Sequence, residues 1–234
     1  MTIQKPMIII ALDFFSKNEA MKLINNLNPN IYILKIGKIM FTLFGNKFIK
    51  ELQKMGFNIF LDLKFYDIPH TIFKTIQAVA SLDVWMISIH VCGGMQMLHS
   101  AKLALKPFHG KKPLLMGVTA LTSFDDLDIR NMGINMSIQN YVLILSKLAQ
   151  DCNLDGIICP GNTVLNVKKH LGNKLKILVP GIRFQKSMCY DQKNIITPQQ
   201  AKKYNVDYIV IGRAITSLKN PLVTLKNIYS NLKI

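Results

Sequence analysis

The stretch IFLDLKFYDIPHT, residues 59–71, carries most of the information about this fold. Its first seven residues have the apolar character of a buried strand, but Asp62 and Lys64 interrupt them and Asp67 follows soon after. Burying three ionisable groups costs free energy unless they pair or take part in chemistry. Side chains two residues apart point to the same face of a strand, so we expect Asp62 and Lys64 to lie together.

Short apolar runs of this kind recur at fairly even intervals along the chain. Each run is continuous rather than alternating, as expected of strands that are buried on both faces. They cover residues 7–13, 31–37, 58–65, 84–91, 113–121, 155–161, 175–182 and 207–213.

Segments with helical spacing separate the runs, and some carry capping residues, such as Ser16 and Thr197. This alternation predicts an α/β protein, a (β/α)8 TIM barrel that forms a single domain over residues 1–234. An open doubly wound sheet is the alternative, but no G-x-G-x-x-G follows the first run.

In such barrels the chemistry lies at the carboxyl ends of the strands. Nearly every polar or charged residue tied to a predicted strand lies at such an end. The residues at the predicted strand ends are Asp13, Lys35, Asp62, Lys64, His90, Thr122, Pro160, Gly161, Gly181, Ile182, Arg183, Gly212 and Arg213.

Arginine is scarce, with three residues among the 29 basic ones. Its planar fork can bind phosphate through two hydrogen bonds at once, which lysine cannot do. Two of the three, Arg183 and Arg213, follow the seventh and eighth predicted strands, where this fold usually binds phosphate. We therefore predict a phosphate site there, with the long irregular loop of residues 183–194 as a lid that carries Gln192.

The other residues at the ends of the predicted strands allow more than one interpretation. Flanking carboxylates favour the ammonium form of Lys64, which suits a general acid facing a carbanion, although the group could simply cap the barrel as an ion pair. Lys35 could extend to solvent, and Asp13 could bind ribose hydroxyls, hold Lys35 or begin the next helix. His90 is more typical of a packed core residue, and Thr122 could bind a polar ring edge.

The net charge of +16 raises the possibility of nucleic-acid binding, but the lysines are dispersed and no recognition motif is present. No apolar run approaches the length of a membrane span, and the N-terminus has no signal-peptide layout, so we expect a cytoplasmic protein without a membrane partner. Four scattered cysteines predict neither a metal site nor a disulfide framework.

The motif DLKFYDIPHT resembles the signature of the orotidine 5'-phosphate decarboxylase family. The elements ALD, LKIG, HVCGG, LTS, PGIR and IGR follow in the family's order over essentially the whole chain. Tyr66 and His70 stand where the bacterial pattern usually has His and Asn, which bears on the loop or a subunit interface.

The resemblance implies decarboxylation of orotidine 5'-monophosphate to UMP in de novo pyrimidine biosynthesis, without a metal or cofactor. It implies that Lys64 protonates C6 as CO2 leaves, within a network of Asp62, Lys35 and Asp67. It also implies a homodimer in which Asp67 and Thr71 reach the partner's site. The implied substrate contacts are Asp13, Lys35, Thr71, Thr122, Arg183, Gln192, Gly212 and Arg213.

Two other functions compete with this expectation. Magnesium-dependent phosphosugar enzymes, such as 3-keto-gulonate 6-phosphate decarboxylase or hexulose-phosphate synthase, share the barrel and the Asp-x-Lys-x-x-Asp pattern. Their motif lacks DIPHT and LTS in this form. A basic nucleic-acid-binding protein is the second alternative, and its nonspecific binding should fade steeply with salt.

Overall fold

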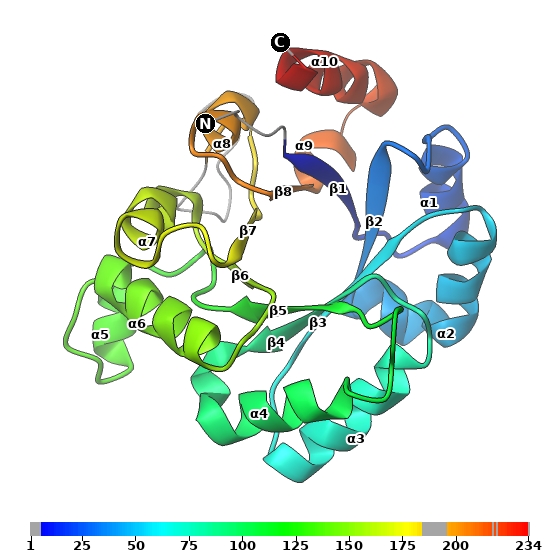
Figure 1. Cartoon of the computed structure of the whole chain (residues 1–234). Helices are drawn as coiled ribbons and strands as arrows, with labels where there is room; N and C mark the ends of the chain where they lie inside the picture. The colour runs from blue at the N-terminus through cyan, green and yellow to red at the C-terminus, as the bar shows by residue number, and fades with distance from the viewer. Residues whose placement is uncertain (1–5, 184–195, 217, 219, 234) are drawn as a thin grey trace.

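Eight parallel strands close into a barrel in the computed structural model of the chain, with β1 paired to both β2 and β8 (Figure 1). The structure describes residues 6–183, 196–216, 218 and 220–233. All eight predicted strands are present, which confirms the (β/α)8 TIM barrel. The strands are β1 (Met7–Leu12), β2 (Tyr32–Gly37), β3 (Ile59–Phe65), β4 (Met86–His90), β5 (Leu114–Val118), β6 (Gly156–Ile158), β7 (Lys176–Val179) and β8 (Tyr208–Ile211).

Helices surround the barrel and connect each strand to the next (Figure 1). The connection between β5 and β6 holds two α-helices, and two more follow β8. The α-helices are α1 (Lys17–Ile24), α2 (Lys38–Lys54), α3 (Pro69–Ala80), α4 (Gly94–Ala104), α5 (Asp126–Asn131), α6 (Ile138–Asp151), α7 (Val164–Leu171), α8 (Pro198–Lys203), α9 (Arg213–Thr216) and α10 (Pro221–Lys233), with 3-10 turns at η1 (Val91–Gly93) and η2 (Gly161–Thr163).

Local signals in the sequence account for several helix ends. Ser16 caps α1 by accepting a hydrogen bond from the backbone N–H three residues later, at 3.4 Å. Thr197 and Gln200 form a reciprocal capping box at the start of α8. Helix α2 begins at Lys38 and continues through a kink at Gly45, where φ is 57°.

Two apolar layers stabilise the barrel. The outer layer lies between the strands and the helices, and the inner layer fills the barrel itself. Complete burial of a large aliphatic side chain contributes about 1.5–3 kcal/mol, so these layers supply most of the driving force for folding. The buried residues of the inner layer are Ile9, Ala11, Ile33, Phe60, Met86, Met116, Val118, Ile158, Leu178, Tyr208 and Val210.

The inner layer determines where the charged residues lie. Ile33 on β2 belongs to this layer, and Lys35, two residues later, points to the same interior at the mouth of the barrel. Phe60 and Asp62 repeat this arrangement on β3. On β2 and β3, polar groups thus replace apolar ones in the top layer, at the carboxyl ends of the strands.

The predicted lid at residues 183–194, with Gln192, lies outside the described residues except for Arg183. Within the described part of the chain, no helix is both long enough and apolar enough to cross a bilayer.

Candidate active site

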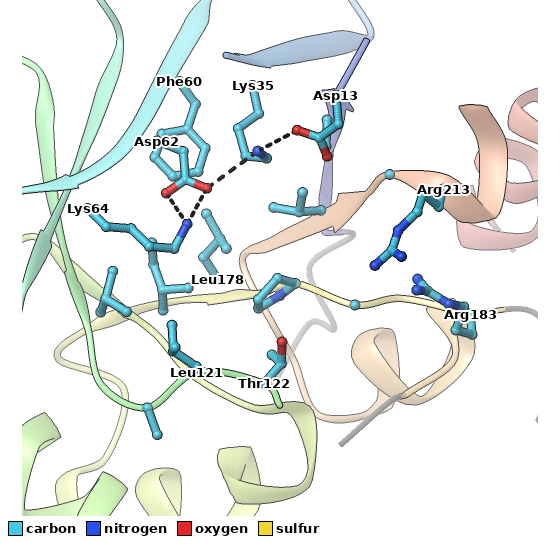
Figure 2. A pocket seen from close by; sticks show the side chains of 18 residues that line it. Asp13, Lys35, Phe60, Asp62, Lys64, Leu121, Thr122, Leu178, Arg183 and Arg213 are labelled. Atoms are coloured by element: carbon cyan, nitrogen blue, oxygen red, sulfur yellow. Dashed lines mark hydrogen bonds and ion pairs between the residues drawn. The ribbon is translucent and has the colours of Figure 1, made fainter. Parts of the chain in front are cut away.

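A pocket opens at the carboxyl end of the barrel, directly above the inner apolar layer (Figure 2). Apolar residues such as Phe60 and Leu178 form its floor, and polar side chains from both ends of the chain form its walls. Most of the predicted site residues meet here, namely Asp13, Lys35, Asp62, Lys64, Thr122, Arg183, Gly212 and Arg213.

Four of these residues form a chain of alternating charges across three strand ends (Figure 2). The Lys35 Nζ lies 3.7 Å from Asp13 Oδ1 and 3.4 Å from Asp62 Oδ2. The Lys64 ammonium donates to both oxygens of Asp62, at 2.9 and 2.8 Å. Asp62 therefore holds two cations at once, and Lys35 links it to Asp13.

Asp62 is the most deeply buried member of this network, with a side chain that is 9% exposed. Burial by itself would raise the pKa of Asp62, but the Lys35 and Lys64 ammonium groups and the hydrogen bonds from Lys64 and Ser88 outweigh it. The pKa of Asp62 is consequently lowered, so the group is an anion at neutral pH.

An irregularity in β3 brings Lys64 to Asp62. Lys64 has a φ of 53°, a left-handed conformation that costs about 1–2 kcal/mol for a residue with a side chain. The pairing of β3 with β4 shifts between Leu61 and Phe65, which marks a bulge at this point. The two side chains do meet, as expected, but the regular alternation of a strand is not what brings them together.

Sequence reasoning missed two residues that support the network. Ser88 on β4 is fully buried, and its hydroxyl donates to Asp62 Oδ1 at 2.8 Å. Gly37, at the end of β2, leaves room for the ion pair, because a Cβ there would lie 3.2 Å from Lys35 Nζ and 3.3 Å from Asp13 Oδ1. A signal for Ser88 existed, since it is a polar residue within the apolar run MISI.

The second polar wall comes from the ends of β7 and β8, and Figure 2 shows it across the pocket from Lys64. Gly181, with a φ of 76°, makes the turn that leads to Arg183. Arg183 is only 6% exposed, and its backbone N–H donates to the Ile196 carbonyl at 3.2 Å. Arg213 is the first residue of α9. The third arginine, Arg130, is exposed on α5 and does not line the pocket.

Three residues of the sequence motif and its neighbourhood lie elsewhere. Asp67 is exposed in the single chain and accepts a hydrogen bond from the Ile68 N–H at 2.7 Å, so it lies outside the pocket of its own chain. Thr71, on α3, does not line the pocket either. His90 packs edge-on against Tyr66, and burial together with the Lys64 and Lys38 cations lowers the pKa of its imidazole.

Residues 6–228 match the family model described as "Orotidine 5'-phosphate decarboxylase / HUMPS family". The chain is 64% identical to orotidine 5'-phosphate decarboxylase of Buchnera aphidicola subsp. Baizongia pistaciae, over 96% of this chain and 95% of the relative. It is 44% identical to that of Escherichia fergusonii, over 97% and 92%.

A crystal structure of orotidine 5'-phosphate decarboxylase from Lactobacillus acidophilus superposes with a TM-score of 0.86 and 32% identity. The superposition covers 99% of this chain and 100% of that one. The family match and the relatives span nearly the whole chain, and all three named proteins are bacterial. The chain therefore belongs to the orotidine 5'-phosphate decarboxylase / HUMPS family and is of the bacterial type.

Proposed function

We propose that this protein decarboxylates orotidine 5'-monophosphate to UMP, as an orotidine 5'-phosphate decarboxylase of pyrimidine biosynthesis. The family name covers two activities, and the relatives at 64% and 44% identity carry the decarboxylase name. The observation that carries the proposal within the pocket is the Asp13–Lys35–Asp62–Lys64 network.

Lys64 serves as the proton donor in our proposal. The bond between C6 and the carboxylate breaks, CO2 leaves, and the electron pair stays on C6 as a carbanion. The Lys64 ammonium offsets this charge and then protonates C6, and the resulting amine takes a proton from solvent. Asp62 lies near the departing carboxylate and orients the ammonium, which its two hydrogen bonds to Lys64 support.

The remaining pocket residues bind the nucleotide. Asp13 and Lys35 contact the ribose, and Thr122 contacts the pyrimidine edge. Arg183, Gly212 and Arg213 bind the phosphate, supported by their position across the pocket from Lys64. Phosphate binding far from C6 supplies binding energy that is used in the transition state. Gln192 joins the phosphate contacts in this proposal, although it lies outside the described residues.

The direct test follows the ultraviolet spectrum of orotidine 5'-monophosphate mixed with the purified protein. We expect conversion to UMP, with the product confirmed by chromatography, and we expect the same rate in excess EDTA. Loss of activity in EDTA would contradict the cofactor-free mechanism and favour the magnesium-dependent alternative. The absence of UMP under both conditions would contradict the proposed function.

We also propose that residues 1–234 form one catalytic domain, that the protein is cytoplasmic, and that it acts as a homodimer with shared sites. Asp67 and Thr71 lie outside their own pocket, which supports a role for them in the site of the partner. A two-fold dimer would make the exchange reciprocal, so each site would combine Lys64 of one chain with Asp67 of the other.

Subunit exchange tests this shared site. Lys64→Ala and Asp67→Asn each inactivate every site of their own dimer, but a mixed dimer has one site with both defects and one with neither. Random mixing makes about half of the dimers mixed, so roughly a quarter of all sites should recover. Activity is measured before and after mixing at fixed total protein, with exchange confirmed by tag pull-down. Exchange without recovery would show that Asp67 acts within its own chain.

A further inference from the structure

We propose that Ser88 is a positioning residue for the decarboxylation, because its hydroxyl holds both Asp62 and the backbone of Lys64 in the arrangement that proton transfer requires. Ser88 lies on β4, is fully buried, and is not among the residues that line the pocket. It therefore acts through its two partners rather than through the substrate. This inference rests on the proposed function.

The bulge in β3 creates the need for such a residue. Leu61 pairs with Ile87 and Phe65 pairs with Ile89, so three residues of β3 face the single residue Ser88 of β4. The backbone N–H of Lys64 lies inside this irregular segment, where the regular ladder is interrupted. It donates instead to the Ser88 Oγ, at 2.9 Å.

The hydroxyl completes a closed ring of hydrogen bonds. Ser88 Oγ accepts from the Lys64 backbone N–H and donates to Asp62 Oδ1 at 2.8 Å, and the same Oδ1 accepts from Lys64 Nζ at 2.9 Å. A hydroxyl can accept and donate at the same time, whereas an alanine at this position could do neither. Both the backbone of Lys64 and the carboxylate that holds its ammonium are thus tied to one atom on the neighbouring strand.

A second buried serine provides a matched control. Ser146 on α6 is also fully buried, and its hydroxyl donates to the Val142 carbonyl of its own helix at 2.7 Å. It does not line the pocket. Ser146→Ala removes the same atoms from an equally buried position but leaves the Lys64–Asp62 geometry unchanged.

The test compares Ser88→Ala, Ser88→Thr and Ser146→Ala with the wild type. We expect Ser88→Ala to lower kcat by roughly 10- to 100-fold, because small displacements of catalytic groups have effects of this size. The KM and the inhibition constant of UMP should change by no more than about threefold, since the phosphate contacts are untouched. Ser88→Thr retains a hydroxyl and should keep a kcat closer to that of the wild type.

Turnover by the wild type and by Ser146→Ala checks the proposed function in the same assay. A Ser88→Ala variant with the kcat of an active wild type would overturn the positioning role alone. The role would also be overturned if kcat and UMP affinity fell in proportion and Ser146→Ala showed the same losses, because general loosening of the barrel would then explain them. A selective fall in kcat, in a variant that unfolds at the same denaturant concentration as Ser146→Ala, would support it.

Discussion

The two polar walls of the pocket differ in the charged groups that they carry. The wall formed by β1, β2 and β3 carries two lysines and two carboxylates that pair with one another in a continuous chain. The wall formed by β7 and β8 carries the guanidinium groups of Arg183 and Arg213 (Figure 2). The first wall pairs its cations and carboxylates with one another, whereas in our proposal the second wall binds the substrate phosphate.

This difference suggests a division of labour. Charges that are paired before substrate arrives are already oriented, so they cost little reorganisation when a carbanion develops. Cations that bind the phosphate contribute binding energy, which is available only with a phosphorylated substrate. The two walls should therefore respond differently to substitution and to removal of the phosphate from the substrate.

The largest effect should come from a substitution in the wall formed by β1, β2 and β3. Lys64→Ala should lower kcat by at least about a thousandfold, because it removes the proton donor. The loss should be similar for orotidine 5'-monophosphate and for orotidine, which lacks the phosphate, since both need a proton at C6. The measurement is steady-state turnover of both substrates, with an unchanged circular dichroism spectrum.

Lys22→Ala is the control for Lys64→Ala, because Lys22 is an exposed lysine in the last turn of α1. It should turn over both substrates as the wild type does. A Lys64→Ala variant that retains more than a few per cent of activity would remove Lys64 from the role of proton donor.

A substitution in the wall formed by β7 and β8 should have a smaller effect, and its size should depend on the substrate. Arg213→Ala should lower kcat/KM for orotidine 5'-monophosphate by about 100-fold, as expected for the loss of charge-assisted hydrogen bonds. The same variant should leave kcat/KM for orotidine nearly unchanged. Arg130→Ala, at the exposed arginine of α5, is the control. Equal losses on the two substrates would contradict a phosphate role for Arg213.

The last prediction concerns stability and its dependence on pH rather than activity. Asp62→Asn should lower the free energy of unfolding at neutral pH by about 3 kcal/mol, because it leaves the Lys35 and Lys64 cations without the carboxylate between them. The folded-state pKa of Asp62 lies below its ordinary value of 3.8. Its contribution is therefore present above that pH and is lost as the pH falls through the folded-state pKa.

Urea unfolding of the wild type and of Asp62→Asn, from neutral pH down to acidic pH, measures this contribution of Asp62 to stability. The difference in the free energy of unfolding between the wild type and Asp62→Asn should be constant near neutral pH. It should become smaller as the solution becomes more acidic. Asp83→Asn is the control, because the Asp83–Lys50 ion pair, at 3.5 Å, lies on the surface. A difference that does not change with pH would mean that the charge of Asp62 does not stabilise the fold.

The sequence predicted the charged residues of the wall formed by β1, β2 and β3 better than the residues that support them. Asp13, Lys35, Asp62 and Lys64 were all identified from their positions at strand ends, because the end of an apolar run is a local property of the chain. Ser88 was missed because a serine has many uses in a strand, and its partners lie 24 and 26 residues away. The sequence placed Asp67 in the loop after the strand, and the structure finds it exposed there, outside the pocket of its own chain.

The sequence by itself determined the kind of fold and the chemical groups available to it. Eight doubly buried runs separated by helical segments favour a closed parallel barrel, because apolar patterning and helix caps act over a few residues. Only the tertiary structure decided how those groups combine. Barrel closure pairs β1 with β8 and so brings Arg213 to the same pocket as Asp13, while the bulge in β3 turns Lys64 onto Asp62 and Ser88. Such contacts depend on the pairing of strands that are distant in sequence, which is complete only when the barrel closes.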